Sequence, residues 1–256
     1  YKERARAAGS EPVEAEPGLH VLRLRKLRGA PWSYPQTVLR LHLRLNRRPV
    51  LRALETAGLR PKSFIALYYG WFWEEWIGNL GAALEVYDCI DEHRAYPGIA
   101  GKPGREAYVW RLEQRMLRCT DCLVTTSPVL LEDRAALARK SLCLPNGVDP
   151  AFWEPVPEAP PVPDDLARLP PPRLVLVGHL QAKLDLEAVA AVAAARPTWS
   201  VTLIGPVERG LRLPAPRANL RWLGPKPFER LRDYLAHGQV GLCLLYTSPS
   251  PRDRTR

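Results

Sequence analysis

The chain has 256 residues, of which 46% are hydrophobic and 25% are charged, and its formal net charge is +10. This composition predicts a soluble α/β protein, because it supplies enough apolar residues for the core of one large or two medium domains. No apolar run approaches the roughly 20 residues of a membrane-spanning helix, so no membrane-spanning segment is predicted, and no secretory leader is visible.

The positive charge is concentrated at the start of the chain. Residues 1–62 carry 14 Lys and Arg against 5 Glu, whereas residues 63–242 have a net charge of −1. Apolar side chains lie within this basic stretch, at Val38, Leu39, Leu41, Leu43 and Leu45. The combination predicts an anionic membrane surface as a partner, where each cation contributes about 1 kcal/mol; a solvated basic helix is the alternative. Nucleic acid is not predicted, because the aromatic residues gather at Tyr68–Trp76, away from the basic residues.

Five strands are predicted in the first part of the chain, near His20–Leu24, Phe64–Tyr69, Leu84–Asp88, Leu123–Thr126 and Leu142–Leu144. A helix is predicted from Arg105 to Arg118, because Val109, Leu112 and Met116 recur at helical spacing on one face. The segment Leu39–Leu45 alternates apolar and polar residues with period two, which favours a strand.

Nine prolines lie between Pro150 and Pro172, a density that predicts a stiff spacer without regular structure. Strands and helices are predicted to follow it at Leu174–Val177, Leu184–Ala195, Val201–Ile204, Leu220–Leu223, Phe228–Ala236 and Gln239–Leu242. Their alternation indicates a parallel sheet with right-handed crossovers. Gly178, Gly205 and Gly224 lie at the carboxyl ends of strands, where such sheets bind ligands, although a tight turn explains any one of them equally well.

The five cysteines are an odd number and lie in strand-like or helix-like stretches. Reduced thiols and a cytoplasmic location are therefore predicted. Cys119 and Cys122 have the spacing of a zinc-ligand pair, but no second pair follows at a usual distance, so no metal is predicted.

A segment reading CLPNGVD, from Cys143 to Asp149, joins the two sets of predicted strands. It is preceded by TTSP at Thr125–Pro128 and followed by VLVGHLQAKLDLEAV, WSVTLIGP and NLRWLGPKP. In this order the motifs resemble the retaining glycosyltransferases of the two-domain GT-B type, specifically the family 4-like branch. The resemblance implies an α/β fold with two Rossmann-like domains. It also favours a helix over Leu39–Leu45, so strand and helix both stay open there.

The resemblance assigns residues 1–149 to an acceptor-side domain, 150–172 to a linker and 173–242 to the first half of a nucleotide-sugar donor domain. The first domain is expected to be incomplete, because the chain starts at Tyr1, not Met, and lacks the opening strand and glycine turn of such a domain. The family's paired glutamates would fall after Leu242, so a truncated donor domain that holds its donor poorly is expected. Residues 243–256 resemble the translated read-through of a sequencing adapter and are expected to be foreign.

The resemblance implies transfer of a sugar, with retention, from a nucleotide-diphosphate donor to a glycan or lipid-linked acceptor of cell-envelope or exopolysaccharide synthesis. No cofactor or metal is implied, because basic side chains and helix dipoles stabilise the leaving diphosphate. Lys183 is expected to bind the donor phosphates together with backbone at Gly178, Gly205 and Gly224, and a solvated lysine in a loop is the alternative for Lys183. Trp222 is expected in the core. A cytoplasmic enzyme at the inner face of the plasma membrane would suit such an acceptor.

On the acceptor side, Asp91 and His93 are candidate catalytic residues that orient an acceptor hydroxyl. Asp88 and Ser127 are candidate acceptor-binding residues. Helix capping is the alternative for Asp91 and Ser127, and a structural role is favoured for His93.

Two other classes of function stay open. A glycosyltransferase-like scaffold or membrane-docking protein would keep the fold and lose the groups of the cleft. Another nucleotide-sugar enzyme of Rossmann type is less favoured, because GHLQAK at Gly178–Lys183 lacks a GxGxxG turn.

Overall fold

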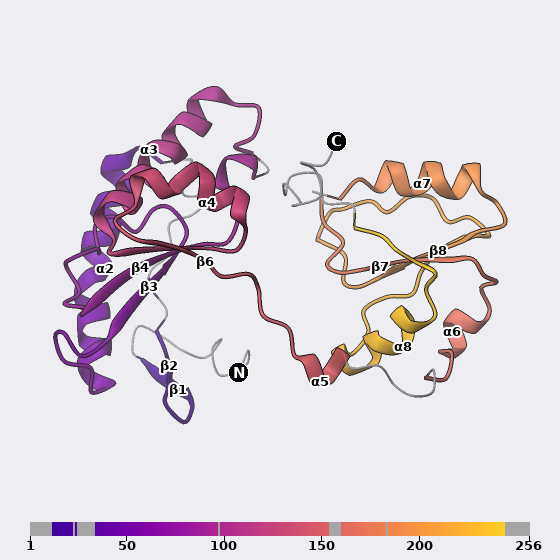
Figure 1. Ribbon diagram of the computed structural model, residues 1–256, viewed down its shortest axis with the longest axis horizontal. Coiled ribbons are helices and arrows are strands. Elements are labelled where there is room, and N and C mark those ends of the chain that lie inside the picture. The colour runs from indigo at the N-terminus through magenta and orange to yellow at the C-terminus, as the bar shows by residue number, and fades with distance from the viewer. Residues whose placement is uncertain are drawn as a thin grey trace. The chain divides into compact units, whose positions relative to one another are not determined.

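The computed structural model describes residues 12–22, 24, 34–96, 98–153, 160–182 and 184–243. The chain divides into two compact units between Asn146 and Gly147, each with its own sheet (Figure 1). Lys183 and residues 244–256 lie outside the described residues, so the phosphate-binding and adapter predictions stay predictions. Among the residues described, no helix is both long and apolar enough to cross a bilayer.

The first unit is built on a parallel sheet in the order β3-β4-β5-β6. Its strands are β3 (Ile65–Tyr69), β4 (Leu84–Cys89), β5 (Cys122–Thr125) and β6 (Ser141–Cys143). The connections carry η2 (His93–Ala95), α3 (Pro103–Cys119), α4 (Pro128–Arg134) and η3 (Ala135–Leu137). The four corresponding strand predictions and the helix predicted from Arg105 to Arg118 are confirmed.

The strand predicted at His20–Leu24 belongs to a separate antiparallel hairpin. Its strands are β1 (Val13–Glu16) and β2 (Leu19–Val21). The turn between them is held by the N–H of Gly18, which donates to Glu14 Oε1 at 2.9 Å. This strand therefore adds nothing to the parallel sheet of the first unit.

The open segment Leu39–Leu45 is helical, as part of α2 (Gln36–Thr56). Leu39 and Leu43 are buried, one helical turn apart, whereas Leu41 and Leu45 are 58% and 69% exposed. The period-two pattern was misleading because leucines occupy both sides of one helix.

The core of the first unit lies on one face of its sheet. Tyr68, Tyr87 and Leu123 of the strands pack there with Leu43 of α2 and Met116 of α3. The side chains of β3 that point the other way, Ile65, Leu67 and Tyr69, are 64%, 47% and 55% exposed. Parallel strands are usually covered on both faces, so this unit presents an uncovered apolar surface within the described part of the chain.

The second unit has a parallel sheet in the order β10-β7-β8-β9. Its strands are β7 (Arg173–Val177), β8 (Ser200–Ile204), β9 (Leu220–Trp222) and β10 (Val240–Gly241). The helical segments are α7 (Leu186–Ala195), η4 (Phe228–Arg230) and α8 (Leu231–Ala236). The predicted alternation of strands and helices is confirmed, although β10 is shorter than predicted and Val240 is exposed.

Both faces of the second sheet are covered. Leu174 and Leu176 of β7 pack against α7, whereas Val175 points the other way and packs with Tyr234 of α8. Figure 1 shows α7 and α8 on opposite sides of β7 and β8. Alternate side chains of β7 thus serve two cores, which explains its continuous apolar run.

The prediction that the proline-rich segment 150–172 has no regular structure was wrong for its described parts, residues 150–153 and 160–172. They contain two short helices, α5 (Pro150–Trp153) and α6 (Asp164–Ala167). Leu166 and Leu169 are buried in the second unit, and Asp165 accepts hydrogen bonds from Lys226 Nζ at 2.7 Å and Tyr234 Oη at 2.9 Å. Pro163 is tolerated because it immediately precedes α6, where a helix needs no backbone donor.

Candidate functional site

The carboxyl edge of the first sheet carries two polar loops. Residues 90–96 follow β4, and residues 126–127 follow β5. The Oγ1 of Thr126 donates to the carbonyl oxygen of Ile90 at 2.9 Å and joins the two loops. Because neighbouring parallel strands end at the same edge, the two loops form one surface where a ligand of such a sheet binds.

Asp88 lies one residue before the end of β4, opposite Tyr69 of β3 in the sheet register. Burial raises the pKa of its carboxyl group, and a hydrogen bond from the Tyr69 side chain partly offsets this effect. The side chain is half-buried. Because side chains alternate along a strand, Asp88 points to the face opposite to Tyr87 and Cys89.

Asp91 is not the cap of a helix. The turn η2 is capped by Glu92, whose side chain accepts from the N–H of Arg94. Asp91 instead accepts a hydrogen bond through Oδ2 from Tyr96 Oη at 2.7 Å. Burial and this carboxylate together raise the pKa of Tyr96. The structure therefore gives Asp91 a fixed orientation at the edge of the sheet without using it for capping.

His93 lies inside the first unit, with only 3% of its surface exposed. Its Nδ1 is 3.4 Å from Tyr87 Oη and 3.6 Å from Glu113 Oε1. A side chain in this place positions the loop that carries Asp91. Its burial leaves almost no surface through which a substrate could contact it.

The buried partner of His93 is an ion pair between Glu113 of α3 and Arg134 of α4, both fully buried. Arg134 Nε donates to Glu113 Oε1 at 2.9 Å, and Tyr87 Oη donates to the same oxygen at 2.9 Å. Burial alone would raise the pKa of Glu113, but hydrogen bonds from His93 and Arg134 outweigh it and lower the pKa. The carboxylate is thus held in its charged form.

Arg134 also reaches the loop after β4. Its Nη2 donates to Glu92 Oε2 at 3.1 Å, and Arg94 Nη2 donates to the same oxygen at 2.7 Å. Burial opposes ionisation of Glu92, but these cations lower its pKa to about 2. The guanidinium groups of Arg94 and Arg134 lie over the ring of Trp110, at 4.6 Å and 5.6 Å from its centroid, respectively. The loop is therefore anchored to α3 and α4 through buried charges.

Cys89, His93 and Glu113 bring three metal-ligating atoms within 4.8 Å of one another. The charge around these atoms argues against a metal ion. The guanidinium of Arg134 already neutralises Glu113 and would repel a cation. The cluster is better described as a hydrogen-bonded network that holds the loop.

Ser127 acts as the N-cap of α4. Its Oγ accepts a hydrogen bond from the N–H of Leu130 at 3.3 Å, and Pro128 occupies the first helical position, as is common. The side chain that the sequence offered for acceptor binding therefore already has a structural partner.

In the second unit, the three glycines predicted to bind the donor meet at one edge of the sheet. Gly178 donates to the carbonyl oxygen of Ile204 at 2.9 Å, and Gly205 donates to that of Gly224 at 3.0 Å. A Cβ on Gly205 would lie 1.8 Å from the carbonyl oxygen of Gly178. Gly205 is thus required because two backbones pass too closely for any side chain.

The surroundings of these glycines contain an aromatic ring and an acid. Trp222 is 49% exposed and donates through Nε1 to the carbonyl oxygen of Gly205 at 3.0 Å, so the expectation that it belongs to the core was wrong. Glu208 accepts a hydrogen bond from the N–H of Ala182 at 2.9 Å. An internal carboxylate therefore occupies one amide of the loop that leads from β7 to α7.

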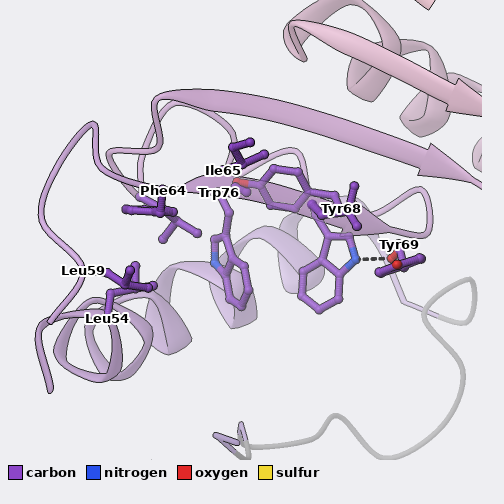
Figure 2. A pocket seen from close by; sticks show the side chains of 11 residues that line it. Leu54, Leu59, Phe64, Ile65, Tyr68, Tyr69 and Trp76 are labelled. Carbon is purple, nitrogen blue, oxygen red and sulfur yellow. Dashed lines mark hydrogen bonds between the residues drawn. The ribbon is translucent and has the colours of Figure 1, made fainter. Parts of the chain in front are cut away.

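A separate apolar hollow of about 350 Å³ lies beside β3 (Figure 2). It is lined only by apolar and aromatic residues: Leu54, Leu59, Phe64, Ile65, Ala66, Leu67, Tyr68, Tyr69, Trp73, Trp76 and Leu80. A sugar or nucleotide site needs several convergent polar groups. The hollow lies along β3, the edge strand of the sheet, and takes in side chains from both faces of that strand.

The sequence analysis missed Glu113 and Arg134. A signal existed for both, because Glu113 lies four residues after Val109, on the apolar stripe of α3, and Arg134 lies four residues after Leu130. A charged residue on the buried face of a helix predicts a buried partner of opposite charge.

No family model matches the chain, and no curated protein matches its sequence. Among solved structures it is similar to sucrose-phosphate synthase from Thermosynechococcus elongatus, at 18% identity and a TM-score of 0.67 over 94% of this chain. The chain spans 63% of the length of that protein. A second similarity, to a protein assigned as UDP-N-acetylglucosamine 2-epimerase from Listeria monocytogenes, has 12% identity, a TM-score of 0.43 and coverage of 85% of this chain and 59% of that one, which is too low to carry a conclusion. The first similarity confirms the predicted fold class, an α/β fold of two Rossmann-like units of the GT-B type.

Proposed function

We propose that the chain is part of a glycosyltransferase that moves a sugar, with retention, from a nucleotide-diphosphate donor to a glycan or lipid-linked acceptor. The observation that carries this proposal is the meeting of Gly178, Gly205 and Gly224 at the carboxyl edge of the second sheet. Ligands of parallel α/β sheets bind at this edge. The five cysteines are unpaired, which supports a cytoplasmic location.

The donor would bind at the second unit through backbone. A Cβ on Gly178 would meet no atom within 4 Å, so this stretch of main chain is open to a ligand. The ring of Trp222 lies beside Gly205 and offers a flat surface for a nucleotide base. Lys183 remains the proposed cation for the diphosphate. The carboxylate of Glu208 already accepts a hydrogen bond from the Ala182 N–H. A bound diphosphate would therefore either displace this carboxylate or accept hydrogen bonds from other N–H groups of the loop.

The acceptor would bind at the first unit through Asp88 and Asp91. Asp91 is oriented by Tyr96 through one carboxylate oxygen, and its other oxygen is suited to accept a hydrogen bond from a sugar hydroxyl. His93 acts as a positioning residue from the buried network. Acid–base assistance by a carboxylate requires this kind of fixed placement close to the reacting hydroxyl.

The proposal is tested by titrating UDP-, GDP- and ADP-sugars into the protein and following Trp fluorescence and nucleotide release. Weak but saturable binding of at least one donor is expected. Gly178→Val should weaken it at least tenfold, because a side chain would cover the open backbone. Gly210→Val is the matched control: Gly210 also has a positive φ and open space around its Cβ position. The proposal fails if no activated sugar binds, or if the two variants behave alike.

A further inference from the structure

The outward face of α2 carries an uninterrupted apolar and basic stripe. Val38, Leu41 and Leu45 are 39%, 58% and 69% exposed, and Arg48 and Arg52 continue the same line as exposed residues. Their spacing of three and four residues places all five side chains on one side of the helix. At 1.5 Å per residue the stripe is about 21 Å long.

The exposed leucines contribute little to the fold. The packing of α2 comes from Leu39 and Leu43 on the opposite side. Large aliphatic side chains that follow one another along an exposed helix form a patch, and such patches mark surfaces that bind another apolar phase or molecule. Leu41 and Leu45 therefore indicate an interaction surface.

A hollow of about 410 Å³ lies on the same helix and is lined by Arg44, Arg47, Arg48, Glu75 and Asn79. Its single carboxylate is already bound, because Glu75 accepts from Arg40 Nε at 3.0 Å and from Arg44 Nε at 2.9 Å. Arg47 Nη1 lies 3.5 Å from Asn79 Oδ1, which is uncharged. Within the described part of the chain, Arg48 has no ion pair. The hollow therefore has the charge and size to receive a phosphate group.

We propose that the outward face of α2 docks on an anionic lipid bilayer. Leu41 and Leu45 enter the boundary between headgroups and acyl chains, and the arginine hollow receives a lipid phosphate. Helices that lie in a bilayer interface combine an apolar stripe with flanking cations in this way. The proposal does not depend on the donor chemistry, so vesicle binding and nucleotide binding can fail independently.

A bilayer explains the surface better than a nucleic acid does. Exposed leucines gain nothing against a phosphodiester backbone, and the stripe from Val38 to Arg52 offers no aromatic ring on which a base could stack. An anionic bilayer accepts both components, since apolar side chains and cations are each stabilised at its surface.

The experiment is co-sedimentation of the full chain with vesicles of phosphatidylcholine alone, or of phosphatidylcholine mixed with phosphatidylglycerol. Binding is expected only to the mixed vesicles, and it should weaken as salt is added. Arg48→Gln with Arg52→Gln should lower the partition coefficient about 25-fold, since each cation near the surface contributes about fivefold. The control pair Arg209→Gln with Arg221→Gln changes the net charge equally on exposed residues of the second unit and should bind normally.

The apolar half of the surface is tested by Leu41→Ala with Leu45→Ala. Alanine keeps the helix, as circular dichroism can verify, and partitioning should fall by roughly tenfold or more because two leucines no longer leave water. Leu142→Ala with Leu144→Ala is the matched control, because these leucines are 52% and 60% exposed elsewhere on the same unit.

Three results would overturn the proposal. One is equal binding to vesicles with and without phosphatidylglycerol. Another is a loss of binding in either control pair as large as in the α2 pairs. The third is binding to heparin or RNA that matches vesicle binding in strength and ignores the leucine pair, which would assign the arginines to a polyanion.

Discussion

The two units finish the carboxyl edges of their sheets in different ways. In the first unit the edge is organised by side chains, because Glu113 and Arg134 anchor the loop that carries Asp91. In the second unit it is organised by backbone, because Gly178 and Gly205 approach each other without side chains. The first edge presents oriented carboxylates, and the second presents open main chain.

This difference matches the needs of two kinds of ligand. A carboxylate with a fixed orientation accepts hydrogen bonds from hydroxyl groups, so in the proposed function the first edge would bind the sugar acceptor. Main-chain amides without neighbouring side chains donate to anionic oxygens, so the second edge would bind the diphosphate. The two edges also depend on different features for their stability. The first depends on buried charges that must stay paired, whereas the second depends on two glycine positions.

The largest effect is expected from Arg134→Met. This change leaves the buried carboxylate of Glu113 without its cation, and removing one partner of a buried pair costs about 3–5 kcal/mol. Urea unfolding should show the loss. Hydrogen exchange should place it in β4 and α3 and leave β7 and β8 protected as before.

The double variant Arg134→Met with Glu113→Leu distinguishes two causes of this destabilisation: the loss of the ion pair itself and the burial of an unpaired carboxylate. It should regain most of the stability, because no unpaired charge remains in the core. If the double variant were as unstable as Arg134→Met, packing around Arg134 would be the cause, and the contrast drawn between the two edges would weaken.

Gly205→Ala is expected to have the next largest effect, this time in the second unit. The new Cβ would lie 1.8 Å from the carbonyl oxygen of Gly178. The alanine would also have to adopt a φ of +140°, which L residues rarely adopt. A loss of about 2–4 kcal/mol follows from the displaced backbone and the strain. Gly178→Ala, with free space around its Cβ position, should cost clearly less. Equal losses for the two variants in denaturant unfolding would contradict the close approach.

Strands that are buried on both faces could be predicted from the sequence, because a continuous apolar run between turn residues has one interpretation. β7 and β8 are continuous apolar runs between turn residues, so their length and position followed from the sequence. α2 could not be resolved, because leucines on both its buried and exposed sides imitate the alternation of a strand. The short helices within 150–172 were not predicted, because the density of proline was taken as evidence against regular structure. The apolar positions Leu166 and Leu169, which are buried, were not considered.

The candidate site could be predicted in part. Gly178, Gly205 and Gly224 were found because a glycine directly after a strand is a local signal. Glu113 and Arg134 each left a local signal, a charge on the buried face of a helix, but the identity of the partner depends on two helices meeting in space. Trp222 was misplaced because its size suggests burial, whereas β9 is an edge strand of its sheet and the ring is half-exposed.

Acid should distinguish the two units. The pKa of Glu92 is lowered to about 2 from a usual 4.5, and that of Glu113 is lowered as well. Lowered values in the folded state give stability that is present above about pH 4.5 and is lost as the pH falls towards 2. Hydrogen exchange of α3 should therefore accelerate between pH 4.5 and 2, after correction for the intrinsic rate, and Glu92→Gln should flatten part of this dependence.

The second unit has a weaker counterpart of this acid response. The pKa of Asp165 is lowered by Lys226 and Tyr234, but the carboxylate is 37% exposed and solvent screens the pair. Exchange in α8 should thus respond less to acid than exchange in α3. An equal response in both helices would show that buried charge is not what separates the units.

The smallest effect is expected from Trp222→Phe. The variant keeps an aromatic ring but loses the hydrogen bond from Nε1 to the carbonyl oxygen of Gly205, which is worth about 1 kcal/mol. If the backbone at Gly205 forms part of the donor site, the loosened carbonyl should weaken nucleotide-sugar binding about tenfold or more, whereas the free energy of unfolding should fall by only about 1 kcal/mol. Trp199→Phe, in the same unit but away from the glycines, is the control and should leave binding unchanged. A larger loss of stability than of binding for Trp222→Phe would instead make the ring a structural support of the glycine edge, and the backbone of the second unit would then rely on a side chain as the first unit does.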